Sequence, residues 1–301
     1  MKKKTFTLFL ILNILFVFTG CQNEKKTDLS SEKNGVEYYK KGEYENALPF
    51  LEKAANSGSI DASRYLGRMY QDGKGVPENF SQSFKWYMKA AEKGDKEASG
   101  MVGASYYTGR GVKQDYNQSL KWLLKAAEKI DAKTVSKRDG KLMGLVAYLY
   151  LTGRGTLQDS SEAAKWAEKA AELDDAESQA LMAFFLFSGQ GVLSDSHAAR
   201  YWAQKSAAQG NDFGQAMMGV LIEYRSPSEP DMKTAISWYE KSAKQGNEIA
   251  QYQLGTIYEN GKGVPKDLSK ARQYYEESAK SQSEIPVKAF LEFEAKRKKQ
   301  Q

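Results

Sequence analysis

The chain has 301 residues, of which 41% are hydrophobic and 27% are charged, a composition typical of a folded protein rather than a disordered one. Its formal charge is +6, but the positive excess lies at the two ends, at Lys2–Lys4 and Lys296–Lys299. The body between these ends is close to neutral, which argues against a nucleic-acid-binding protein because such proteins cluster Lys and Arg on one surface.

The N-terminus has the pattern of an export signal. Lys2–Lys4 precede Phe6–Phe18, an apolar run of about 13 residues that is broken only by Thr7 and Asn13. A membrane-spanning helix needs roughly 20 apolar residues, so this run is too short to be one. We therefore predict a signal peptide over residues 1–20.

The sequence that ends this segment, Phe18-Thr19-Gly20-Cys21, resembles the lipobox of bacterial lipoproteins. The resemblance implies that Cys21 is acylated and becomes the mature N-terminus, although Phe18 departs from the usual aliphatic residue. An ordinary secretory signal with an incidental cysteine is the alternative. Gln22 in place of Asp implies the periplasmic face of the outer membrane if the host is Gram-negative. Cys21 is the only cysteine, so no intramolecular disulfide can form.

Residues 21–34 are polar and are predicted to be a flexible tether between the lipid and the folded part. Residues 35–58 then form a helical unit with Phe50 in its second half and a short loop at Lys41-Gly42-Glu43. This short loop makes residues 35–58 resemble a tetratricopeptide unit.

One aromatic position recurs along the rest of the chain and sets a repeat register. The spacings between successive copies are 36, 44, 36, 36 and 36 residues. The copies are Trp86, Trp122, Trp166, Trp202, Trp238 and Tyr274. Glycines at 73, 109, 153, 189 and 261 follow the same period, including its longer step. Two residue types with one period predict a repeat architecture.

Each repeat has the pattern of two helices. In the second repeat, Ala98, Val102 and Tyr106 share one helix face, and Gly109 ends that helix because glycine adopts the left-handed conformation readily. Trp122 belongs to the helix that follows. A single hairpin cannot bury both of its faces, so neighbouring hairpins must stack.

Six copies between residues 59 and 283 resemble Sel1-like repeats, which are relatives of tetratricopeptide repeats. The stretches that carry the resemblance include LGRMYQDGKGVPENFSQSFKWYMKAAEKG (66–94) and LGTIYENGKGVPKDLSKARQYYEESAK (254–280). The third and fourth copies depart at Val146-Ala147 and Met182-Ala183, and Arg225–Pro230 replaces the glycine loop of the fifth. The resemblance implies an all-α, right-handed α-solenoid of stacked antiparallel hairpins over 59–283. Residues 284–301 are predicted to be a C-terminal capping helix with a basic tail.

No motif for catalysis, nucleotide binding or metal binding is present. The glycine loops match neither GxxxxGK[ST] nor a strand-linked GxGxxG. His197 is the only histidine and has no cysteine near it, which argues against a metal site. Some Sel1-like proteins act on β-lactams, but they resemble a cysteine-rich group to which this chain does not correspond. We therefore predict a non-enzymatic protein with no cofactor, metal or nucleotide.

Two positions of the first helix change character along the array. The position of Arg68 becomes Tyr148 and Phe184 in the third and fourth repeats, and the position of Gln71 becomes apolar from the second repeat to the fourth. The apolar residues predicted to bind a partner are Tyr107, Tyr148, Leu151, Phe184 and Phe187. The alternative is simple burial, because these helices are apolar nearly all round.

These observations predict a membrane-anchored scaffold that binds protein partners of the bacterial cell envelope and is held to the membrane by a lipid on Cys21. The alternatives are a cell-wall or small-ligand binding protein, which would need tryptophan faces open to solvent, and an envelope hydrolase, which would need a convergent polar cluster.

Overall fold

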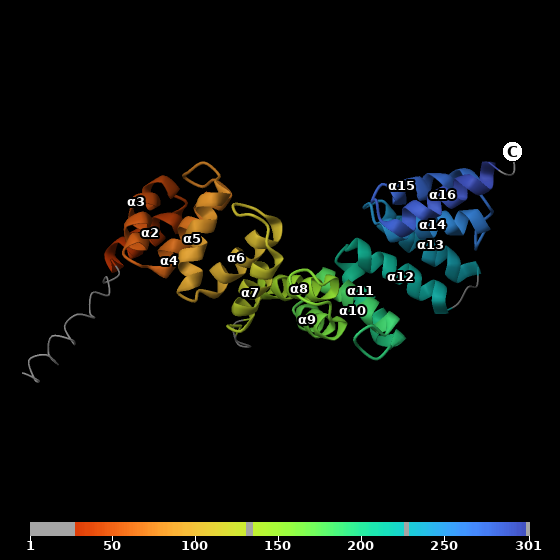
Figure 1. The fold of residues 1–301 in the computed structure, drawn as a ribbon, viewed down its shortest axis with the longest axis horizontal. Helices are drawn as coiled ribbons and strands as arrows, with labels where there is room; N and C mark the ends of the chain where they lie inside the picture. Colours follow the sequence, from red (N-terminus) through yellow and green to blue (C-terminus); the bar gives the residue numbers. More distant parts are fainter. Residues whose placement is uncertain (1–27, 131–134, 226–228, 299–301) are drawn as a thin grey trace, which may run out of the picture. The chain divides into compact units, whose positions relative to one another are not determined.

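The computed structural model describes residues 28–130, 135–225 and 229–298. Over these residues the chain forms fifteen α-helices and no β-strand, which confirms the predicted all-α repeat fold (Figure 1). The helices belong to two compact units, the first ending at Ala126 and the second beginning at Ala127.

The first unit contains three helical hairpins. Its helices are α2 (Leu29–Lys41), α3 (Tyr44–Asn56), α4 (Ile60–Asp72), α5 (Phe80–Glu92), α6 (Lys96–Thr108) and all but the last residue of α7 (Tyr116–Ala127). The hairpin of α2 and α3 is the unit predicted to be tetratricopeptide-like, and α4 to α7 are the first two repeats.

The second unit contains four hairpins and one further helix. Its helices are α8 (Lys137–Thr152), α9 (Ser160–Glu172), α10 (Ala176–Ser188), α11 (Ser196–Ala208), α12 (Asp212–Arg225), α13 (Glu229–Ala243), α14 (Glu248–Asn260), α15 (Leu268–Ala279) and α16 (Glu284–Lys298). Each first helix packs on the second helix of its own repeat and on its neighbours in the array.

The first hairpin begins earlier than predicted. α2 begins at Leu29, so residues 29–34, predicted to be part of the tether, are helical. Asp28 caps this helix, because its Oδ1 accepts a hydrogen bond from the Ser31 backbone N–H at 3.0 Å and its Oδ2 lies 2.9 Å from Lys53 Nζ on α3. These contacts, with the Ser31 backbone first, lower the pKa of Asp28 to about 2. Residues 29–34 were predicted to be a tether because they are polar, but the helix there is stabilised by the Asp28 cap and by the contact of Asp28 with α3.

The two glycines of each glycine loop have different structural roles. The first glycine of each loop closes the first helix in the left-handed conformation, as Gly189 does at φ 72°. The second glycine lets the loop approach the preceding hairpin: a Cβ on Gly191 would lie 2.2 Å from the Ser160 carbonyl oxygen, at the start of α9. The loop therefore packs on the helix of the preceding repeat, and this contact has no room for a side chain.

Within each hairpin the residue sizes at one contact are complementary. The first helix carries glycine where the second helix carries a large residue, in the pairs Gly67/Tyr87, Gly103/Leu123, Gly219/Tyr239 and Gly255/Tyr275. A Cβ on any of these glycines would lie 2.6–2.8 Å from the partner side chain. The third and fourth repeats instead pair alanine with alanine, at Ala147/Ala167 and Ala183/Ala203, within the same buried clusters. In these two repeats, alanine replaces the glycine of the first helix, and alanine also replaces the large residue that faces it on the second helix.

A buried serine differs between the first two repeats. Ser83 Oγ donates a hydrogen bond to the Gly67 carbonyl oxygen at 2.8 Å. Ser119, which stands at the equivalent position, is fully buried, and its Oγ has no partner among the described residues. The other four repeats carry alanine at this position.

We expect Ser119→Ala to stabilise the chain by about 1 kcal/mol, because it removes a buried hydroxyl that makes no hydrogen bond. The matched variant Ser83→Ala should cost about 1 kcal/mol, because it removes a formed bond. Hydrogen exchange of the α4–α7 amides measures both changes locally, which suits an array whose repeats open separately. A loss of protection in Ser119→Ala would contradict the assignment.

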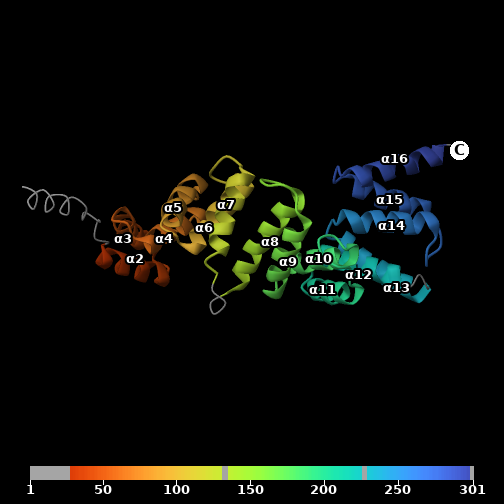
Figure 2. The same ribbon diagram turned by 60° about the horizontal axis from the view of Figure 1, so that its bottom comes forward.

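The last helix, α16, packs at the end of the second unit. Phe293 is buried and Phe290 packs against the final core cluster, whereas Leu291 is exposed. Figure 2 shows α16 beside α14 and α15. Part of the basic tail is paired, because Lys296 Nζ lies 3.1 Å from Glu259.

Candidate protein-interaction surface

The predicted binding residues fall in both units. Tyr107 lies on α6 of the first unit and is half-buried. The other four residues lie on α8 and α10 of the second unit: Tyr148 is 37% exposed, and Leu151, Phe184 and Phe187 are half-buried. None of the five is fully buried, so all reach the surface, and the second unit brings four of them to two neighbouring first helices.

Two further aromatic residues extend this group. The Phe184 ring lies 6.3 Å from the Phe213 ring, and the Phe187 ring meets the Tyr224 ring edge-on at 5.2 Å. Tyr224 is 73% exposed. We call these residues the unit-2 aromatic surface: Tyr148, Leu151, Phe184, Phe187, Phe213 and Tyr224. Phe213 and Tyr224 were missed because only two helix positions were compared, and the same alignment extended to the start and end of the first helix would have found them.

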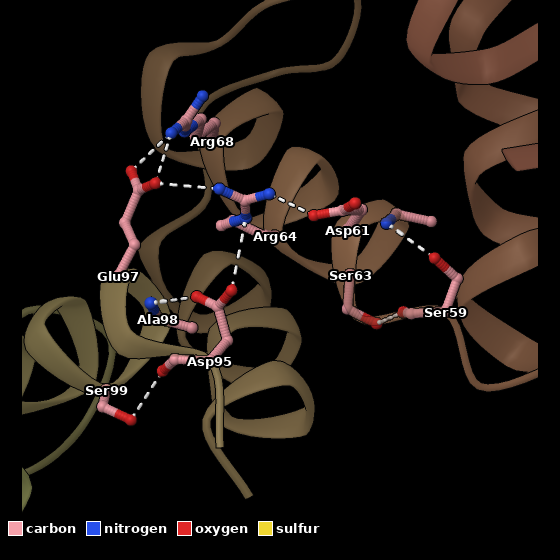
Figure 3. Close-up of polar contacts among 10 residues, drawn as sticks. Ser59, Asp61, Ser63, Arg64, Arg68, Asp95, Glu97, Ala98 and Ser99 are labelled. Carbon is pink, nitrogen blue, oxygen red and sulfur yellow. Dashed lines mark hydrogen bonds and ion pairs between the residues drawn. The ribbon is translucent and has the colours of Figure 1, made fainter. Parts of the chain in front are cut away.

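The contact between Phe184 and Phe213 has a polar counterpart in the first unit. Arg68 and Glu97 occupy the equivalent positions there, and Glu97 binds both Arg68 and Arg64 (Figure 3). Arg64 also pairs with Asp61 and lies 3.6 Å from Asp95. Neighbouring first helices are thus joined by an ionic contact in one place and an aromatic contact in another.

The carboxylates of this ionic cluster all have partners within it. The Glu97 oxygens are bound by two guanidinium groups, at 3.1 Å from Arg64 and 2.5 Å from Arg68. Asp95 caps α6 by accepting a hydrogen bond from the Ala98 backbone N–H at 2.6 Å. The carboxylates of Glu97 and Asp95 are therefore engaged in contacts that join α4 to α6.

The change from polar to apolar residues at the Gln71 position has a cause inside each repeat. Tyr87, Tyr239 and Tyr275 donate from their hydroxyls to Gln71, Glu223 and Glu259, at 3.2, 3.1 and 2.8 Å. Burial raises the pKa of all three tyrosines, so the hydroxyls stay protonated and remain donors.

The second, third and fourth repeats carry Leu123, Ala167 and Ala203 in place of these tyrosines, so they have no buried hydroxyl that needs an acceptor. Tyr107, Leu151 and Phe187 are therefore free to be apolar at this position. This intra-repeat coupling permits the unit-2 aromatic surface but does not by itself require a partner.

The repeated tryptophans pack inside the array. Trp86, Trp166 and Trp238 lie against buried clusters, and a lysine three residues later covers each ring. Lys89 Nζ, for example, lies 3.9 Å from the Trp86 ring centre. A face covered by an ammonium group is not open for stacking on a sugar or another ring.

The remaining candidates from the sequence are His197 and Cys21. His197 is exposed near the start of α11, and no group of three or more His, Cys, Asp or Glu side chains in the described part of the chain could hold a metal ion. Cys21 lies outside the described residues. Among the helices that the structure describes, none is both long and apolar enough to cross a membrane.

Stacked hairpins with glycine-closed first helices define a helical-repeat protein. The chain belongs to the Sel1 repeat family, whose repeat matches residues 60–95, 97–131, 142–175, 176–211, 213–247 and 249–283. The predicted family is thereby confirmed. Among curated proteins, no sequence matches the chain significantly.

Two solved structures are similar to the chain at 30% sequence identity. One is a protective antigen of uropathogenic Escherichia coli strains with an SLR fold, with a TM-score of 0.66 over 87% of this chain and 60% of that one. The other is a Sel1 repeat protein from Oxalobacter formigenes, with a TM-score of 0.64 over 82% of this chain and 96% of that one. The chain thus spans only 60% of the length of the first relative.

Sel1 repeat proteins generally mediate protein–protein interactions, and the family typically consists of non-catalytic scaffolds. The predicted class of function agrees with this family at that level.

Proposed function

We propose that the chain is a lipid-anchored, non-catalytic scaffold of the bacterial cell envelope that binds a protein partner on the unit-2 aromatic surface. The observation that carries the proposal is the exposure of large apolar side chains on neighbouring first helices, with Tyr148 37% and Tyr224 73% exposed. Aromatic residues that reach solvent in a group supply much of the binding energy at protein interfaces.

The chemistry of this surface favours a partner with apolar side chains. Leu151 and Phe184 pack against one buried cluster and so are held in place before binding. Ile249, at the position equivalent to Phe213 in the next repeat, is 39% exposed and continues the apolar character. A rigid surface loses little conformational entropy when it binds, which supports affinity.

The anchor is proposed from the signal sequence and Cys21. We expect Cys21→Ser to release the chain from the membrane fraction and to prevent incorporation of radioactive palmitate. Wild-type processing should also be blocked by globomycin, which inhibits the peptidase that acts on lipoproteins. Unchanged processing with globomycin would mean an ordinary secretory signal.

The binding proposal is tested by crosslinking in intact cells, followed by mass spectrometry of the proteins that co-purify. We expect the double variant Tyr148→Ser/Tyr224→Ser to reduce capture of the main partner by roughly tenfold or more, because exposed aromatic anchors contribute most of such interfaces. Tyr201→Ser is the matched control, because Tyr201 is 51% exposed but lies on a second helix. Equal capture by all three proteins would place the partner elsewhere.

A further inference from the structure

The first unit carries two rows of lysines on its second helices. Lys85 and Lys89 lie one turn apart on α5, and Lys121 and Lys125 occupy the equivalent positions on α7. All four side chains are exposed. Lys89 and Lys125 lie 3.9 and 4.3 Å from the ring centres of Trp86 and Trp122, which holds their ammonium groups at the surface. We call these four residues the unit-1 lysine rows.

These lysines have no carboxylate partner among the described residues. Residues 80–93 contain three lysines and one glutamate, and so do residues 116–129. The equivalent helix α9 of the second unit is different, because Lys165 pairs with Glu162 at 2.7 Å and two more glutamates lie on the same helix. Like charges four residues apart weaken a helix slightly, and an external anion would relieve this repulsion.

The position of the rows in the chain indicates which anion. α2 begins at Leu29, capped by Asp28, which is seven residues after Cys21. Seven residues can span at most about 25 Å. If Cys21 carries a lipid, the first unit is therefore held close to the bilayer.

We propose that the unit-1 lysine rows bind the anionic phospholipid headgroups of the membrane that holds the anchor. This inference rests on the anchoring proposed above for its choice of a lipid over an acidic protein. Basic side chains near a bilayer are attracted to anionic lipids, and one acyl anchor combined with a basic patch binds a membrane more stably than the anchor alone. In this proposal the lysines of α5 and α7 contact the headgroups.

The test uses the chain from residue 22 onward, which contains every described residue and no acyl group, so it does not depend on the lipid at Cys21. Sedimentation is measured with vesicles of equal parts phosphatidylglycerol and phosphatidylcholine, and with vesicles of phosphatidylcholine alone. We expect binding only to the anionic vesicles, weakened by added salt because the attraction is screened beyond about 10 Å.

Two quadruple variants with the same change in net charge separate a local surface from overall charge. Lys85/Lys89/Lys121/Lys125→Gln should weaken binding by roughly tenfold or more, because each lysine near the surface contributes several-fold to affinity. Lys165/Lys169/Lys205/Lys241→Gln changes equivalent positions in the second unit and should stay within about twofold of wild type. Circular dichroism checks that both variants keep their helices.

Equal loss in both variants, or no preference for anionic vesicles, would overturn the lipid surface. If the vesicles are not bound but Cys21 processing remains sensitive to globomycin, the anchor stands and the rows bind something else, such as an acidic protein. If the vesicles are bound and processing is insensitive, the rows bind lipid while the anchoring proposal fails.

Discussion

Gly219→Ala is expected to destabilise the second unit by about 2 kcal/mol, although alanine is the better helix former. A Cβ at Gly219 on α12 would lie 2.6 Å from Cε1 of Tyr239 on α13. The Tyr239 ring cannot move aside cheaply, because it is fully buried and its hydroxyl donates to Glu223 at 3.1 Å. The helix axes must therefore separate, which loosens the contacts around the pair.

A double-mutant cycle tests this explanation. Tyr239→Ala alone should cost about 3–5 kcal/mol, because it leaves a cavity and removes the donor to Glu223. Gly219→Ala/Tyr239→Ala recreates the alanine pair that Ala183 and Ala203 form in the fourth repeat. Its total cost should fall below the sum of the single variants by about 2 kcal/mol, measured by urea unfolding and hydrogen exchange. Additive costs would show that Gly219 does not limit the approach of the two helices.

The repeat architecture was predictable because two residue types carry the period independently. The registered tryptophans mark the second helices, and glycines such as Gly189 mark the ends of the first helices, where a left-handed residue is required. Each of these requirements is local, so it can be recognised in the sequence of a single repeat. The helical start of α2 was not predictable in this way, because it depends on the contact between Asp28 and Lys53 on another helix.

The sequence predicted which residues of the candidate surface are apolar, but not why the equivalent positions in other repeats are polar. Comparing equivalent positions found that Tyr148 and Phe187 are apolar but left open whether they are exposed or buried. It did not reveal that the polar residues in the outer repeats accept a hydrogen bond from a buried tyrosine hydroxyl, as Glu223 does from Tyr239. That relation joins positions 16 residues apart on two helices, and it is visible only when the hairpin is folded.

Phe184→Ser is expected to lower stability by about 2–3 kcal/mol as well as to impair partner capture. Phe184 packs against both large buried clusters of the second unit, so its ring is shared between surface and core. Tyr148 is 37% exposed and lies in neither of these two clusters. We therefore expect Tyr148→Ser to change stability by less than about 1 kcal/mol.

The two variants together decide what the unit-2 aromatic surface is for. If it binds a partner, Tyr148→Ser loses capture while its unfolding curve stays close to that of wild type. If the surface is an incompletely covered core, Tyr148→Ser captures the partner normally, and any loss of capture by Phe184→Ser follows its lowered stability. Thermal unfolding measured on the same preparations used for crosslinking distinguishes these outcomes, because a fall in capture that merely follows the fraction unfolded reports stability alone.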